Sequence, residues 1–186
     1  MTGVFLGRFI DSRRDDSAQK IELMIKIILR TDGYINSANT KSTILLSLSS
    51  ALLAAILLNY DKFLNKLTNA GDKYVLSVIA LASIVLILMA IFHCLKGVIP
   101  FLNHSNKKNI FSFVDTLYYY KNVSEYINAI NEKKPAEMVS SLASLNFNLS
   151  KALIDKYENQ KKSIECIILS LMTIGLMVLV IIFSQI

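Results

Sequence analysis

Charged residues are scarce in this sequence, and three long stretches contain none at all. Only 18% of the 186 residues are Asp, Glu, Lys or Arg, whereas a soluble domain of this size carries about 25%. The uncharged runs cover residues 42–60, 74–95 and 166–186. Helices of these lengths measure roughly 28–33 Å and match a bilayer hydrocarbon core of about 30 Å. The runs therefore predict three transmembrane helices rather than three buried helices of one small soluble domain.

Glycine, proline and cysteine are also infrequent. The chain has 6 Gly and 2 Pro, and this shortage of turn-forming residues favours long helices over a strand-rich fold. The two cysteines, Cys94 and Cys166, lie at the edges of apolar runs and form neither a disulfide framework nor a metal motif. We interpret them as small apolar residues in a reduced compartment. The N-terminus lacks a signal-peptide pattern, so we expect it to be retained.

Catalytic motifs are missing as well. Neither histidine, His93 or His104, has a cysteine or carboxylate at metal-ligand spacing, and there is no phosphate-binding loop or nucleophile elbow. The three apolar runs hold no charge, whereas intramembrane charges mark proton relays and ion-coupled transporters. We therefore expect no enzyme activity, no cofactor and no metal, and we rank a membrane enzyme or transporter last.

The distribution of Lys and Arg predicts the membrane topology. Segments 1–41 and 96–165 carry seven and ten of these residues, and segment 61–73 carries three. Because basic residues concentrate on the cytoplasmic side, the split of seventeen against three predicts a cytoplasmic N-terminus and a periplasmic C-terminus. The net charge of +6 then reflects orientation and contact with anionic lipid, and we expect no sequence-specific binding of nucleic acid.

Together these patterns predict an all-α integral membrane protein with three transmembrane helices and a helical cytoplasmic region. The predicted protein divides into four regions. They are a cytoplasmic N-terminal region with an amphipathic helix (1–41), a transmembrane hairpin (42–95), a cytoplasmic helical region (96–165) and a C-terminal transmembrane helix (166–186). The spacing of Ile21, Met24, Ile25 and Ile28 predicts the amphipathic helix. We expect this helix to lie on the membrane surface or to pack on a partner helix.

The cytoplasmic helical region is predicted to hold a loop, a short helix and the start of a long one. The loop covers Gly97–Asn109 and the short helix Phe111–Ile130. Pro135 suits the first turn of a helix, and no Gly or Pro interrupts the chain from Ala136 to Ile174. The last helix is therefore predicted to be long and continuous with the third span. Its packing side carries Met138, Leu142, Leu145, Leu149 and Ala152 or Leu153.

Small residues recur at helical spacing in the spans, where they allow helices to approach closely. In the first span they are Ser47, Ser50, Ala51, Ala54 and Ala55. In the other two they are Ser77, Ala80, Ser83, Ser170, Thr173 and Gly175. Packing of the three spans within one subunit is the favoured interpretation, and contact between subunits is the alternative.

Several short motifs keep a recognisable order. Ala38-Asn39-Thr40-Lys41-Ser42 opens the first span, Pro100 lies in the next loop, Asn109-Ile110-Phe111-Ser112-Phe113 is rich in aromatics, and Lys156-Tyr157 precedes the last span. From about Ile21 to the end, this order resembles the small transmembrane effectors of bacterial antiphage systems, typified by the Pycsar effector family. The family pattern has an Asp where this chain has Asn39 and an Ala where it has Ser42.

The resemblance implies a function and a set of partners. It implies a dormant protein of the bacterial inner membrane that, once infection is sensed, disrupts the membrane by pore formation or depolarisation and stops growth. Similar effectors accompany CBASS and retron systems. The implied partners are the lipid bilayer, further copies of the chain, and either a cyclic nucleotide or a protein or nucleoprotein of the defence system. The alternative is a non-toxic membrane anchor, immunity protein or regulatory subunit of a larger complex.

Five residues are candidates for contact with the trigger, and each has an ordinary structural explanation too. Asn39 and Lys41 belong to the motif that opens the first span, where Lys41 also suits a positive-inside anchor. Arg13 and Arg14 suit either phosphate or anionic lipid. Tyr118, in a run of three tyrosines, suits either a stacked base or an aromatic core.

Overall fold

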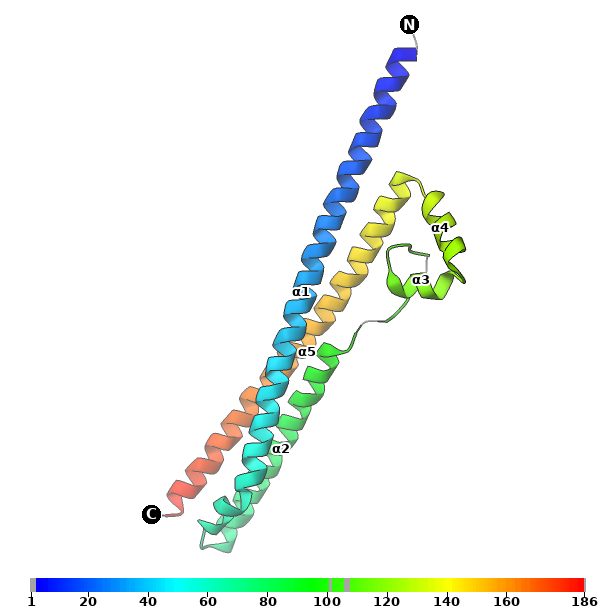
Figure 1. Cartoon of the computed structure of the whole chain (residues 1–186). Coiled ribbons are helices and arrows are strands. Elements are labelled where there is room, and N and C mark those ends of the chain that lie inside the picture. The colour runs from blue at the N-terminus through cyan, green and yellow to red at the C-terminus, as the bar shows by residue number, and fades with distance from the viewer. Residues whose placement is uncertain (1–2, 101, 106–107, 186) are drawn as a thin grey trace. The chain divides into compact units, whose positions relative to one another are not determined.

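The described part of the chain folds into five helices and the segments that join them (Figure 1). A computed structural model describes residues 3–100, 102–105 and 108–185, with side chains described from Asp16 onward. The helices are α1 (Gly3–Asn65), α2 (Ala70–Val98), α3 (Phe113–Tyr119), α4 (Val123–Asn131) and α5 (Pro135–Phe183). No strand occurs in the described ranges.

Three of these helices, α1, α2 and α5, are long and apolar enough to cross a membrane. The predicted all-helical fold with three spans is therefore confirmed. So is the long last helix, since α5 begins at Pro135 and runs without a break to Phe183.

The chain divides into two compact units. The polar unit comprises the residues up to Asn36 together with Pro100–Ile154, and the membrane unit comprises Ser37–Ile99 and Asp155–Ile186. The membrane unit holds the three predicted spans, and helices α1 and α5 each contribute residues to both units.

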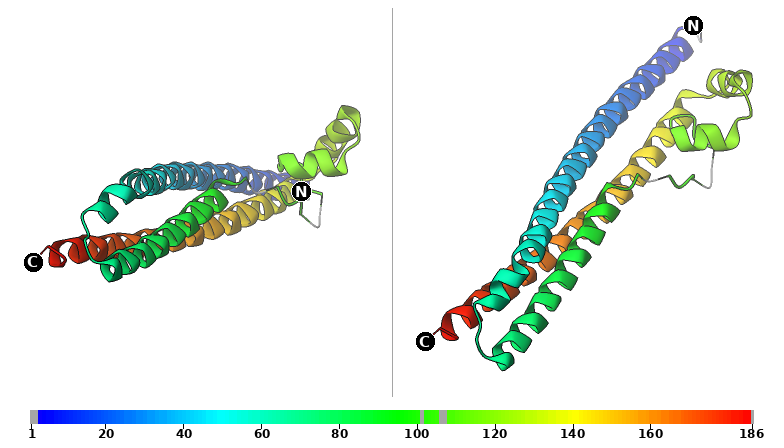
Figure 2. Two further views of the ribbon diagram at one scale, coloured as in Figure 1. Left: turned by 90° about the horizontal axis from the view of Figure 1, so that it is seen from below. Right: turned by 60° about the horizontal axis from the view of Figure 1, so that its bottom comes forward.

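In the membrane unit, α1, α2 and α5 lie side by side (Figures 1 and 2). Their buried residues recur in steps of four and three, the spacing of left-handed helix packing. On α2 these are Leu76, Ala80, Ser83, Ile87, Ala90, Cys94 and Gly97. On α5 they include Lys156, Gln160, Ser163, Ile167, Ser170 and Met177, and on α1 Ala38, Ser42, Ser49 and Ile56.

Hydroxyl groups inside the membrane unit pair across the helices. Ser83 Oγ lies 2.6 Å from Thr173 Oγ1, and Ser163 Oγ donates to Ala90 O at 3.1 Å. Tyr60 OH donates to Ser77 Oγ at 2.8 Å. Because an unpaired polar group is costly in an apolar interior, these bonds let the polar residues of the three helices face one another.

The small residues of the first span do not pack within the subunit, which corrects the favoured interpretation. Ser47, Ser50, Ala51, Ala54 and Ala55 are all exposed. The buried stripe of α1 instead follows a seven-residue repeat, which meets the matching repeats of α2 and α5. In the second span, by contrast, Ala80 and Ser83 are buried as packing residues.

The predicted helix over Phe111–Ile130 is wrong, because the segment forms two helices. Ser112 caps α3 by accepting a bond from Asp115 N at 3.3 Å, and Asn122 caps α4 by accepting from Glu125 N at 2.8 Å. Such caps satisfy the free N–H groups at a helix start, so a second cap favours a second helix. The loop before α3 also begins later than predicted, since α2 continues to Val98.

The predicted amphipathic segment lies within α1 and continues into the first span without a break. Ile21, Met24 and Ile28 are half-buried, whereas Ile25 is 44% exposed. The packed face therefore follows the same steps of three and four as the rest of α1.

Candidate functional site

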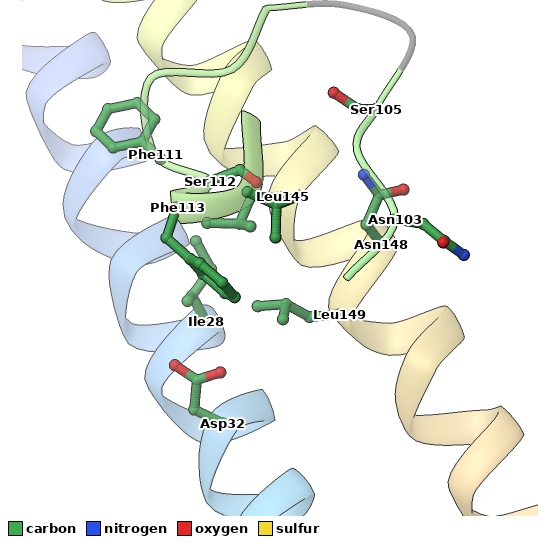
Figure 3. Close-up of a pocket in the computed structure, with 11 residues that line it drawn as sticks. Ile28, Asp32, Asn103, Ser105, Phe111, Ser112, Phe113, Leu145, Asn148 and Leu149 are labelled. Atoms are coloured by element: carbon green, nitrogen blue, oxygen red, sulfur yellow. The ribbon is translucent and has the colours of Figure 1, made fainter. Parts of the chain in front are cut away.

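The polar unit contains a pocket of about 360 Å³ between α1, α5 and the segment that leads into α3 (Figure 3). Its apolar lining comes from Ile28, Phe111, Phe113, Val114, Leu145 and Leu149. Its polar lining comes from Asp32, Asn103, Ser105, Ser112 and Asn148. In Figure 3 the side chain of Phe113 lies between Ile28 of α1 and Leu149 of α5. A volume of this size suits a small molecule or a few side chains of a partner.

Ser105 is fixed at the edge of this pocket by α3. The buried carboxylate of Asp115 accepts hydrogen bonds from Ser105 N at 2.8 Å and from Ser105 Oγ. Tyr119 OH donates to Ser105 O at 2.6 Å. Asp115 stands three residues after the Ser112 cap, so the helix start that forms α3 also places the carboxylate. The polar edge of the pocket is thereby held in one arrangement.

Other hydrogen bonds join segments of the polar unit beside the pocket. Asn109 Nδ2 donates to Ser141 O of α5 at 2.8 Å, and Tyr126 OH of α4 donates to Ile110 O at 2.7 Å. Between α1 and α5, Thr31 Oγ1 lies 2.9 Å from Asn146 Oδ1. These bonds hold the segments of the polar unit together through backbone as well as side-chain groups.

The chemistry of the pocket is apolar with one acidic group. Asp32 is exposed at the pocket, and the salt bridges between described side chains do not include it. The described lining residues include no Lys, Arg or His. Among the described residues, no group of three His, Cys, Asp or Glu side chains is arranged to hold a metal. The pocket therefore favours a neutral or cationic group over a phosphate.

Of the predicted trigger residues, Tyr118 belongs to the polar unit. It is 61% exposed and stacks on His104, with ring centroids 3.9 Å apart and planes 11° apart. Its ring therefore already has a stacking partner on one face, although it does not line the pocket. Arg13 and Arg14 precede the side chains that the structure describes.

Asn39 and Lys41 belong to the other unit, so the structure does not place the candidates in one cluster within either unit. Lys41 is exposed, as an anchor at the membrane surface would be. Asn39 is half-buried, and its Oδ1 atom is buried without a hydrogen-bond partner among the described residues. A buried oxygen of this kind is unusual in native proteins.

The motif around Asn39 meets the motif around Lys156 in a three-helix junction of the membrane unit. Gln160 Nε2 of α5 donates to Ala38 O of α1, and to Ser42 Oγ at 3.0 Å. Lys156 Nζ donates to Gly97 O at 2.7 Å and to Ile99 O at 3.2 Å, at the end of α2. A cation there also suits the negative end of the helix dipole.

Sequence reasoning missed both the junction and the pocket. Gln160 and Gly97 carried no signal of their own, because their partners stand more than fifty residues away in the chain. For the pocket, the capping pattern of Ser112 and Asp115 could have predicted that a helix begins between Phe111 and Val114.

Comparison with known families decides the relationship. The sequence model of the Pycsar effector protein domain matches residues 23–184, which include α2 to α5 and most of α1. The chain belongs to the Pycsar effector family. Comparisons with curated proteins and with solved structures gave no match. The motifs that meet at the three-helix junction all lie inside the segment that matches the family.

Membership of the Pycsar effector family establishes the general class. These are transmembrane effectors of antiphage defence, so the chain is a membrane effector. The resemblance noted from the motifs of the sequence is confirmed.

Proposed function

We propose that this protein damages the bacterial inner membrane, by pore formation or depolarisation, when a signal of infection engages its polar unit. The observation that carries the proposal is the family match over the three membrane helices. The absence of charge inside the spans supports membrane damage over coupled transport. Growth arrest of the infected cell follows from loss of the membrane potential.

Assembly of several copies is the proposed route to membrane damage. The small residues of α1 support it, because Ser47, Ala51 and Ala55 are exposed rather than used inside the subunit. Small residues on an outer face let two transmembrane helices approach closely. The homo-oligomer is therefore proposed to form through this face of α1.

The pocket of the polar unit is the proposed trigger site. Its rim carries the Asp32 carboxylate, which repels the phosphate of a cyclic nucleotide. A defence-system protein that inserts apolar side chains and one basic side chain satisfies both Asp32 and the apolar lining. We therefore favour a protein or nucleoprotein trigger over a cyclic nucleotide, with Phe113 as the apolar contact.

Expression without other phage-defence components tests membrane damage. The wild-type chain should collapse the membrane potential, read with a potential-sensitive dye, before nucleotide pools fall. Ala51→Leu should abolish the collapse, because bulk on an outer face blocks close approach of a second copy. The control Ala82→Leu adds the same bulk to an exposed position of α2 and should leave the collapse unchanged.

Membrane levels of each variant decide how the result is interpreted. An Ala51→Leu chain that accumulates normally and still depolarises cells would rule out this face of α1. A wild-type chain that accumulates without any depolarisation would favour the anchor, immunity or regulatory alternative.

Calorimetry with a panel of 3′,5′-cyclic nucleotides tests the trigger. We expect no binding by the purified protein in detergent. Saturable binding that Phe113→Ala or Asp32→Asn changes would replace the protein trigger with a nucleotide in this pocket.

A further inference from the structure

A second hollow, which we call the outer groove, lies in the membrane unit between the start of α2 and the end of α5. It has a volume of about 480 Å³ and is lined by Asp72, Val75, Ile79, Leu176, Leu179, Val180, Phe183 and Ser184. Figures 1 and 2 show the C-terminal end of α5 near the connection between α1 and α2. The groove therefore opens at one end of the membrane unit.

The outer groove is polar at one end and apolar along the rest. Asp72 and Ser184 stand at the end where α2 begins and α5 finishes. From there the lining runs along α2 to Ile79 and along α5 to Leu176, a length of roughly 12 Å at the rise of a helix. One polar end followed by an apolar channel is the pattern of a phospholipid, with a headgroup at the surface and a chain in the bilayer.

The apolar part of the outer groove has a firm floor and exposed walls. Ile79 and Val180 pack against the buried cluster of Leu67, Leu76, Ala80 and Met177. On the walls, Leu179 is 47% exposed and Phe183 is 69% exposed. Inside a bilayer, the exposed parts of these side chains contact neither the rest of the subunit nor water. Hydrocarbon is therefore their natural contact.

The polar end offers acceptors for a cation. Asp72 is half-buried, and the salt bridges between described side chains do not include it. Ser184 Oγ donates its proton to Ile181 O at 2.9 Å, so its lone pairs remain to accept a bond. A carboxylate and a hydroxyl oxygen together suit a primary ammonium group, which has three N–H donors.

We propose that the outer groove binds an aminophospholipid, phosphatidylethanolamine, with one acyl chain between α2 and α5 and its ammonium group at Asp72 and Ser184. The charge of Asp72 selects this headgroup over the anionic phosphatidylglycerol, which has no cation to offer. A transmembrane helix of a second copy is the other occupant to test, since Lys62, Lys66 and Lys73 also carry ammonium groups near this end of the spans.

Competition between two lipids tests the proposal on the full-length protein. The protein is reconstituted in vesicles with equal amounts of palmitoyl-oleoyl phosphatidylethanolamine and phosphatidylglycerol, then extracted, and the retained lipid is measured by native mass spectrometry. A charge-assisted contact should enrich phosphatidylethanolamine about tenfold. Asp72→Asn should bring the two lipids close to equal retention, whereas the control Asp61→Asn, at an exposed position near the end of α1, should keep the enrichment.

The acyl-chain part of the proposal has its own variants. Leu179→Trp fills the outer groove and should remove the retained lipid, whereas Leu171→Trp, at an exposed position of α5 outside the groove, should not. Leu176→Trp serves in place of Leu179→Trp if that variant loses helicity or monodispersity. Equal retention of both lipids by the wild type, or unchanged enrichment in Asp72→Asn, overturns the proposal. So does loss of an oligomer in Leu179→Trp with lipid retention unchanged, which would make the groove a contact between copies.

Discussion

At the scale of single residues, Gly97 shows how closely two helices of the membrane unit approach. A Cβ atom at position 97 would lie 2.8 Å from Ser42 Oγ, a side chain that is fully buried. At Gly175, on α5, no described atom outside the adjoining helix backbone lies within 4 Å of the corresponding position. Comparing substitutions at the two glycines therefore distinguishes the effect of close packing from the general effect of glycine on helix stability.

Gly97→Ala is expected to lower the free energy of unfolding by about 1–3 kcal/mol, because overpacking forces neighbours to move. Gly175→Ala should be neutral or slightly stabilising, since alanine is the better helix former. Denaturation in mixed micelles, followed by helicity, measures both. A smaller loss for Gly97→Ala in a Ser42→Ala background would locate the cost at the Ser42 hydroxyl. Equal effects at the two glycines would contradict the close contact.

Lys156 is a buried cation outside the predicted spans. Burial lowers the pKa of its ammonium group from the ordinary value of 10.5. As the pH rises toward 10.5, the folded state releases this proton before the unfolded state does. The unfolded state then binds more protons, and the contribution of Lys156 to stability increases with pH.

Comparison with Lys156→Met isolates this effect from the other lysines. The difference in melting temperature should shift in favour of the wild type between about pH 8 and about pH 10. Lys151→Met, at an exposed position of α5, is the control and should show no such trend. If the melting temperature of the wild type, relative to that of Lys156→Met, stays constant or falls over this range, the folded protein does not depress the pKa of Lys156.

At the scale of elements, α5 is one helix that supplies residues to both units. If a signal reaches the membrane unit through α5, a break in this helix should prevent the signal from causing membrane damage. Glu158 is exposed, so Glu158→Pro removes a backbone bond without removing a buried side chain. The local cost is about 3 kcal/mol. We expect normal membrane levels but no depolarisation on infection, and Glu158→Ala should respond like the wild type. A full response of Glu158→Pro would exclude coupling through a continuous α5.

At the scale of the whole molecule, the basic residues predict one orientation. Reporter fusions after Lys96 should be active in the cytoplasm, and fusions at Asn69 or after Ile186 should be active in the periplasm. Replacing Lys107 and Lys108 by Gln is expected to leave this orientation in place, because eight basic residues remain in that segment. A cytoplasmic signal after Ile186 would contradict three spans with an inward N-terminus.

The sequence alone determined the membrane class, the three spans and the length of α5. These features follow from local physics: charge is excluded from hydrocarbon, and the stretch from Ala136 to Ile174 contains neither Gly nor Pro to break a helix. The start of α5 at Pro135 could also be predicted locally, because proline suits the first turn of a helix. The order of short motifs also indicated the family, which the match over residues 23–184 confirms.

Only the tertiary structure decided which side of each helix is used. The first span carries two possible packing stripes, one of small residues and one through Ser42, Ser49 and Ile56. Both have helical spacing, and only the second is buried in the structure. The pocket and the outer groove are likewise made by residues far apart in the chain, from Ile28 to Leu149 and from Asp72 to Ser184. Such sites depend on which helices become neighbours, and no local pattern carries that information.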